Sequence, residues 1–233
     1  MNAAPGQRTL WRNARLLDAA SGRDETGDLL VEDGRIADIG PNLFPEGPPE
    51  STEVLDCAGH CLAPGLVDMR AFLGEPGFEH RETLASGSAA AASGGITSIA
   101  ARPDTEPVVD DIALVEFVKS LARATAQVRV HPMAAITKGL GGSEMTEFGL
   151  LAEAGAVAFC DGENAVADAL VMSRVLTYAS NWDLLVVQLP AEPRLAGSGC
   201  MNSGEVATRL GLAGIPAAAE VIMLERDLRL VEA

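Results

Sequence analysis

The chain has few aromatic and histidine side chains, and its basic residues are outnumbered by its acidic ones. Aromatic residues make up 4% of the 233 residues, and the three histidines are His60, His80 and His131. Lys and Arg total 17 against 33 Asp and Glu, so the formal net charge is −16. Such a surface repels phosphate backbones and anionic membranes, and scarce aromatic rings give bases little to stack on. Neither nucleic acid nor a membrane is therefore an expected partner.

Cysteines and long apolar runs are also scarce. The four cysteines, Cys57, Cys61, Cys160 and Cys200, lack zinc-ribbon spacing and are interpreted as buried, reduced thiols. Cys57 and Cys61, with His60 between them, leave a weak metal-binding pattern. No run approaches the ~18 apolar residues of a membrane span, and no apolar signal region is found near Met1. These features predict a cytoplasmic protein.

Residues 8–62 have the pattern of short strands joined by turns. Two apolar runs, 29–32 and 35–40, flank Asp33-Gly34, a pair that tolerates the positive φ of a type I′ hairpin turn. The segment 41–49 contains four prolines and is expected to be a loop. We therefore predict a small N-terminal, β-sandwich-like domain over residues 1–61.

From residue 62 onward the pattern becomes strand followed by helix, repeated. The strands are expected at 62–72, 96–101, 128–135, 156–160 and 184–189, and the helices at 81–93, 109–125, 145–154, 164–180 and 215–232. Alternating βα units predict a parallel sheet covered by crossover helices. Residues 62–233 thus form an α/β domain that resembles an incomplete (β/α)8 TIM-type barrel of about five units. Its open edges leave three possibilities: a fragment, a rearranged sheet, or completion by a partner.

Several motifs, in order along the chain, resemble the dihydroorotase family of cyclic amidohydrolases. Pro64-Gly65-Leu66-Val67-Asp68 is similar to the first barrel strand of that family, and the segment 75–83 is similar to the loop that follows it. Further similar segments lie at 89–98, 132–140, 148–151, 201–206 and 214–220. The resemblance covers nearly the whole chain and implies the amidohydrolase barrel fold.

The resemblance also implies a metal centre whose ligands have been replaced here. Active members use a His-x-His pair on the first strand, an Asp after the fourth strand and a His after the fifth, and these positions are Arg70, Phe72, Asp161 and Leu189 in this chain. Arg has no lone pair to donate and Phe has no ligand atom. Two later family groups would lie beyond Ala233. Only Asp161 is still a residue of a type that can bind metal. We therefore expect no bound metal and no catalytic residue in this chain, whereas the resemblance implies zinc in active relatives.

Two substrate-side positions are changed as well. The resemblance implies an Arg that clamps the substrate carboxylate where this chain has Gly74, and an Asn where it has Asp104. A carboxylate at the second position would repel an anionic substrate unless Arg102 offsets its charge. For Asp161 we favour a structural role, as the cap of a helix that starts near Asn164.

These expectations together predict a non-catalytic, dihydroorotase-like subunit of pyrimidine biosynthesis. By resemblance to inactive homologues, it would be an oligomer that scaffolds aspartate carbamoyltransferase. Two alternatives remain open. The chain could be an active zinc-dependent dihydroorotase or a related cyclic amidohydrolase, with ligands supplied from elsewhere, or it could be a truncated fragment of such an enzyme.

Overall fold

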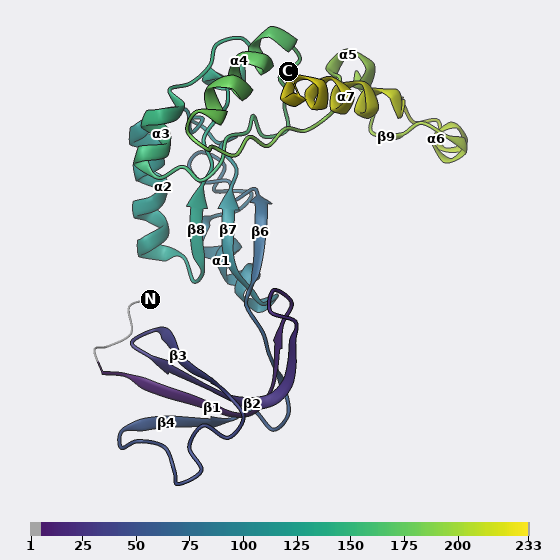
Figure 1. Ribbon diagram of the computed structural model, residues 1–233. Helices are drawn as coiled ribbons and strands as arrows, with labels where there is room; N and C mark the ends of the chain where they lie inside the picture. The colour runs from purple at the N-terminus through teal and green to yellow at the C-terminus, as the bar shows by residue number, and fades with distance from the viewer. Residues whose placement is uncertain (1–5, 233) are drawn as a thin grey trace. The chain divides into compact units, whose positions relative to one another are not determined.

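The computed structural model describes residues 6–232, which fall into two compact units divided between Gly65 and Leu66. The first unit contains strands β1 (Arg8–Asp18), β2 (Arg23–Glu32), β3 (Arg35–Gly40), β4 (Thr52–Asp56) and β5 (Cys61–Leu62). The second contains the βα units (Figure 1). The strand expected at 62–72 is therefore two elements, because Cys61–Leu62 pairs with β1 and a separate strand, β6, spans Leu66–Ala71.

The N-terminal unit is a single five-stranded sheet in the order β3-β2-β1-β4, with β5 also paired to β1. The predicted hairpin is confirmed: Glu32 pairs with Arg35, and Asp33 and Gly34 have φ values of 50° and 75°. β1 has a bulge between Trp11 and Ala14. On the other side of β1, the part before the bulge pairs with β4 and the part after it pairs with β5. The sandwich-like description is thus refined to one sheet that turns at a bulge.

The second unit opens with three parallel strands in the order β6-β7-β8, where β7 is Ile96–Ala101 and β8 is Arg129–Pro132. Helix α1 (Leu84–Ser93) packs on β7, and α2 (Ile112–Thr125) packs on β8 (Figure 1). Asp111 caps α2 by accepting a hydrogen bond from the N–H of Leu114 at 3.0 Å. Helices that connect parallel strands pack on the sheet in this way.

The expected strands at 156–160 and 184–189 are reduced to single parallel bridges, Ala134–Phe159 and Phe159–Val186. The hydrogen bonds keep the parallel register: the N–H of Phe159 donates to Leu185 O at 2.9 Å, and the N–H of Val187 donates to Phe159 O at 2.8 Å. The chain then enters a turn at residues 162–163. The strand order still follows the sequence order, as in the first part of a (β/α) barrel.

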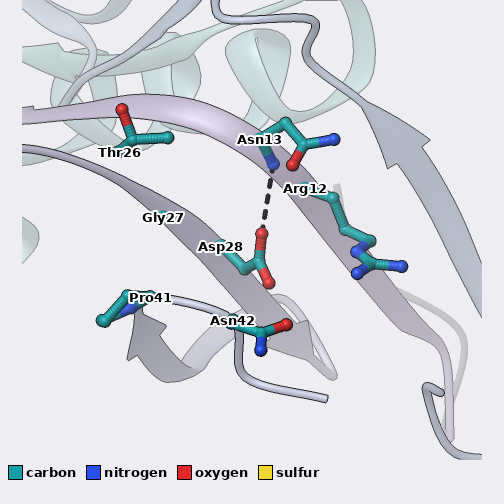
Figure 2. Close-up of a pocket in the computed structure, with 7 residues that line it drawn as sticks. All are labelled: Arg12, Asn13, Thr26, Gly27, Asp28, Pro41 and Asn42. Atoms are coloured by element: carbon teal, nitrogen blue, oxygen red, sulfur yellow. Dashed lines mark hydrogen bonds between the residues drawn. The ribbon is translucent and has the colours of Figure 1, made fainter. Parts of the chain in front are cut away.

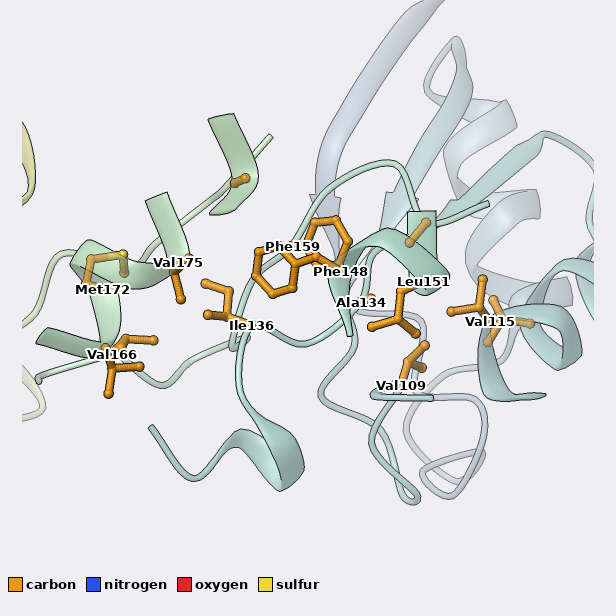
Figure 3. Packing of buried hydrophobic residues seen from close by; sticks show 14 residues of the cluster. Val109, Val115, Ala134, Ile136, Phe148, Leu151, Phe159, Val166, Met172 and Val175 are labelled. Carbon is orange, nitrogen blue, oxygen red and sulfur yellow. The ribbon is translucent and has the colours of Figure 1, made fainter. Parts of the chain in front are cut away.

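The main core lies between this sheet and the helices α2, α3 (Phe148–Ala154) and α4 (Ala169–Ser180) (Figure 3). The rings of Phe148 and Phe159 stack with their centroids 4.0 Å apart, and both side chains are fully buried. Figure 3 shows Ile136 and Val175 beside this pair. Burying these side chains fixes the start of α3 against the fourth parallel segment, and so positions the residues that follow Cys160.

The last part of the chain contains α5 (Pro193–Ala196), β9 (Met201–Asn202), α6 (Glu205–Leu210), β10 (Gly214–Ile215) and α7 (Ala218–Glu232). The strands β9 and β10 form a two-stranded parallel sheet. The final helix starts at Ala218, so Pro216 precedes it and does not occupy its first turn. The carbonyl of Pro216 instead accepts a hydrogen bond from the N–H of Ala219 at 2.9 Å.

Candidate site at the carboxyl ends of the parallel strands

Arg70 lies near the end of β6, and its guanidinium reaches the loop that follows the fourth parallel segment. Its Nη2 donates a hydrogen bond to Gly162 O at 2.8 Å and lies 3.5 Å from Oε1 of Glu163. A fixed cation therefore occupies the position of the first expected metal ligand, and it is already engaged by a carbonyl and a carboxylate. Guanidinium groups hold such planar oxygen partners well but cannot coordinate a metal.

Arg102 lies directly after β7 and joins the same cluster. Its Nε donates to Oδ1 of Asp104 at 2.9 Å, its Nη2 pairs with Oδ2 of Asp104, and its Nη1 pairs with Glu163. The Arg102 and Asp104 side chains are only 10% and 16% exposed. The carboxylates hold the pKa of Arg102 above its ordinary value, chiefly through the hydrogen bonds that Arg102 donates to Asp104. Arg102 thus offsets the charge of Asp104, as the sequence allowed.

Phe72, at the second expected ligand position, forms the apolar side of this cluster. The guanidinium carbon of Arg81 lies 4.5 Å from the centre of the Phe72 ring, and that of Arg102 lies 5.5 Å from it. These are cation–π distances. The two expected histidine positions are therefore brought together in space, as the resemblance implies, but they serve an arginine–carboxylate–aromatic cluster.

Glu163 and Gly162 are parts of this cluster that the sequence reasoning missed. Glu163 joins Arg70 to Arg102, and Gly162 has a φ of 59°. A Cβ at Gly162 would lie 2.5 Å from Cγ of Asp104, closer than any real contact allows. The signal that could have found them is the run Asp161-Gly162-Glu163, an acid-rich turn directly after a buried strand.

Asp161 does not cap a helix, so that prediction is wrong. Helix α4 starts at Ala169 and is capped by Asp168, whereas the Asp161 carboxylate accepts a hydrogen bond from the N–H of Thr137 at 2.9 Å and a second one from the Thr137 hydroxyl. The Asp161 side chain is buried, and this burial raises its pKa from the ordinary value even though the hydrogen bonds oppose the shift. Asp161 ties the fourth parallel segment to the loop after β8.

Leu189 and Gly74 are the two remaining positions at which the resemblance implies a metal ligand or a substrate contact. Leu189 is half-buried, and its carbonyl accepts a hydrogen bond from the N–H of Ala191 at 2.9 Å. Gly74 is buried with a φ of 66°, and a Cβ there would lie 2.6 Å from Glu82 O. The local backbone therefore disfavours an arginine side chain at position 74.

The residues at this position do not fit a divalent metal. Arg70 and Phe72 supply no ligand atom, and both Asp161 oxygens are hydrogen-bonded to Thr137. Burial raises the pKa of the nearby Cys160 thiol to about 11, so it is not a thiolate at neutral pH. Within residues 6–232, no group of three or more His, Cys, Asp or Glu side chains is arranged to hold a metal ion.

The N-terminal unit has a cavity of about 250 Å³ beside the β1 bulge (Figure 2). The buried carboxylate of Asp28 lies on its wall, where it accepts hydrogen bonds from the N–H groups of Asn13 and Leu43, both at 3.1 Å. The other lining residues are Arg12, Asn13, Thr26, Gly27, Pro41 and Asn42. Asp28 thus connects the bulge to the loop after β3, which is a structural role.

Comparison with known proteins places the chain in a family. A family model described as dihydro-orotase-like matches residues 59–233. The dihydroorotase of Solibacter usitatus is 44% identical over 95% of this chain, which covers 50% of that relative. The dihydroorotase of Syntrophobacter fumaroxidans is 43% identical over 96% of this chain, which covers 51% of that relative. The chain therefore spans about half the length of these relatives.

Solved structures show the same fold. The L-hydantoinase of Arthrobacter aurescens superposes with a TM-score of 0.78 at 21% identity, over 97% of this chain and 51% of that protein. A D-hydantoinase superposes with a TM-score of 0.71 at 22% identity. Among the described helices, none has the length and apolar character needed to cross a bilayer. The family model and the 44% identical relative show that the chain belongs to the dihydroorotase-like family of the amidohydrolase fold.

Proposed function

We propose that this chain is a dihydroorotase-like protein that does not itself hydrolyse or close cyclic amides and that acts as a binding subunit in pyrimidine biosynthesis. The observation that carries the proposal is the ion-paired guanidinium of Arg70 at the first expected metal-ligand position. Metal-assisted hydrolysis requires a bound water whose pKa falls from about 15.7 to about 7. A cation held at this position opposes a second cation there.

The partner in this proposal is aspartate carbamoyltransferase, with which the chain would form a hetero-oligomer in the cytoplasm. Support for this partner comes from the resemblance to inactive homologues alone. Mixing the two purified proteins at micromolar concentration should give one larger species on a sizing column. Separate elution of the two proteins would contradict the scaffold role.

A second candidate is an active, zinc-dependent cyclic amidohydrolase, completed by a chain that supplies further ligands. The 44% identity to a dihydroorotase favours it. Under this alternative the Arg70 side chain would have to leave Gly162 and Glu163 before a metal could enter.

Metal analysis with activity measurement separates the two candidates. We expect the purified protein to contain far less than one zinc per chain and to show no turnover of dihydroorotate with added zinc. The matched variant is Arg70→His combined with Phe72→His, which restores the ligand pair and should raise the zinc content above that of the parent. Stoichiometric zinc together with turnover in the parent chain would overturn the non-catalytic proposal.

A further inference from the structure

The cavity beside the β1 bulge is lined by residues of the N-terminal unit alone (Figure 2). The bulge places two residues, Arg12 and Asn13, opposite the single residue Asp28 of β2. A bulge bends its strand and re-aims the side chains beside it. Pro41 and Asn42, in the loop after β3, line another wall. All of the walls therefore come from residues 12–42.

Arg12 presents a positive charge to this cavity. Its Nε atom is shielded from solvent and has no hydrogen-bond partner among residues 6–232. A buried N–H without an acceptor destabilises the folded state, and such groups normally have a partner. Arg12 and Asp28 line the same cavity, yet they do not bond to each other. An oxygen acceptor within the cavity would satisfy Arg12.

Asp28 presents a negative charge to the same cavity. It is 4% exposed, and its two carboxylate oxygens accept hydrogen bonds from neutral backbone groups, the N–H groups of Asn13 and Leu43. Each oxygen has a second lone pair, so the carboxylate can accept two further hydrogen bonds. A buried carboxylate is most stable when a cation or further donors compensate its charge. A positively charged donor in the cavity would supply this compensation.

The two opposite charges restrict what the cavity can hold. A net anion would meet the Asp28 carboxylate, and a net cation would meet the Arg12 guanidinium. An apolar molecule would leave both groups without partners. A zwitterion satisfies both at once. The cavity volume of about 250 Å³ is smaller than the roughly 300–1,000 Å³ of pockets for drug-sized ligands, so the ligand has to be small.

We propose that this cavity binds a small zwitterion of the α-amino-acid class. The carboxylate of the ligand would accept hydrogen bonds from the Arg12 guanidinium, and its ammonium group would donate to Asp28. The amide of Asn42 on the cavity wall offers a further donor and acceptor (Figure 2). Such a ligand would join β1, β2 and the loop after β3, and it would therefore stabilise the folded state. The site lies in a different unit from the arginine cluster, so it is independent of whether the chain hydrolyses any substrate.

The test uses the whole chain with L-serine as the zwitterion, sodium acetate as the carboxylate alone and methylammonium chloride as the ammonium alone. Ionic strength is held constant with NaCl, because salt changes the stability of this acidic chain. Isothermal titration calorimetry should give a Kd for L-serine of about 1 mM or below, and the melting temperature should rise as L-serine is added. Acetate and methylammonium should each bind at least about tenfold more weakly, because each satisfies only one of the two charges.

Two variants locate the binding site. Arg12→Gln removes the guanidinium and should weaken binding of L-serine by at least about tenfold. Asn42→Gly removes the amide and should weaken binding about threefold. Glycine readily adopts the φ of 49° at this position, so the loop is retained. Arg35→Gln is the matched control, because Arg35 is exposed on β3 and does not line the cavity, and it should bind as the parent does. Unchanged circular dichroism would show that the variants are folded.

Three outcomes would overturn the proposal. L-serine gives no binding heat and leaves the melting temperature unchanged, or acetate or methylammonium binds as tightly as L-serine, or Arg12→Gln binds L-serine as tightly as the parent. An equal rise in melting temperature in the parent and in Arg12→Gln would be a general effect of L-serine on the solvent and would also contradict a site. If Arg12→Gln does not fold, unchanged binding of L-serine by Asn42→Gly decides against the proposal.

Discussion

Arg102 is the best-satisfied charged residue of the candidate site, because two carboxylates hold one nearly buried guanidinium. Asp104 engages it through both carboxylate oxygens, and Glu163 engages it from the neighbouring loop. A largely buried ion pair of this kind adds little stability compared with apolar residues at both positions. Removing only one partner, however, destabilises the protein strongly, because the other charge stays buried without compensation. Each buried charge of the site is therefore stable only while its partner of opposite charge is present.

Removing Arg102 alone should be costly. We expect Arg102→Met to lower the free energy of unfolding by about 3 kcal/mol, because Asp104 would stay largely buried without its cation. The double variant Arg102→Met, Asp104→Leu should lose much less than the sum of the two single variants. Urea unfolding of all four proteins measures the coupling, and additive effects would show that the pair is not energetically linked.

Asp161 gives a prediction about pH. Because burial raises its folded-state pKa above the ordinary 3.8, the folded state binds the proton more tightly than the unfolded state does. Its contribution to stability is fully present below about pH 4 and is lost as the pH rises through the raised value. We expect the unfolding free energy of the parent to fall relative to Asp161→Asn over this range, as measured by urea unfolding. A constant difference between the two proteins would rule out a raised pKa.

At the scale of elements, capping residues set where the helices begin. Asp168 accepts hydrogen bonds from the N–H groups of Leu170 and Val171 at 2.7 and 3.2 Å, so α4 starts at Ala169 although its apolar pattern begins earlier. Asp111 does the same for α2. A side-chain cap competes well with a further helical turn because it satisfies N–H groups that the helix leaves unpaired.

Removing the α4 cap should have a modest effect. We expect Asp168→Ala to lower the free energy of unfolding by about 1 kcal/mol, and Asp168→Asn to retain most of that stability. Thermal unfolding of the three proteins under the same conditions is the measurement. Equal losses in the Ala and Asn variants would mean that the negative charge matters more than the hydrogen bonds.

At the scale of the whole molecule, two features stand out: the high negative charge and the exposed apolar residues. Leu66, Val67 and Met69 of the edge strand β6 are 62%, 61% and 75% exposed. Edge strands with exposed apolar side chains are commonly covered by a further segment of polypeptide. They fit a chain that spans half the length of its relatives and folds as an incomplete barrel.

Salt should stabilise the protein as a whole. With a formal net charge of −16, the folded state carries more repulsion than the expanded chain does. Raising NaCl from about 10 mM to about 200 mM shortens the screening length from about 30 Å to below 10 Å and should raise the melting temperature by a few degrees. A lower melting temperature at the higher salt concentration would show that specific ion pairs, such as Arg102 with Asp104, outweigh the general repulsion.

Local patterns determined much of the fold. The Asp33-Gly34 turn predicted the hairpin, and the alternation of apolar strands and helices predicted parallel βα units in sequence order, because turn chemistry and periodicity act over few residues. The same patterns overestimated the last two strands, since pairing depends on where neighbouring segments leave the sheet. The changed positions Arg70 and Phe72 came instead from the resemblance to the dihydroorotase family, because no turn or periodicity marks a metal-ligand position.

The partners of each charged group were decided only by the tertiary structure. Arg70 meets Gly162 across 92 positions of sequence, and Thr137 meets Asp161 across 24. Parallel crossover connections bring the ends of separate strands to one edge of the sheet, and no local pattern encodes which side chains meet there. The sequence by itself, through its resemblance to the family, determined that an arginine and a phenylalanine stand at two expected metal-ligand positions. Tertiary packing decided that Arg70, Arg102, Asp104 and Glu163 form a network in their place, because an ion pair depends on distance in space.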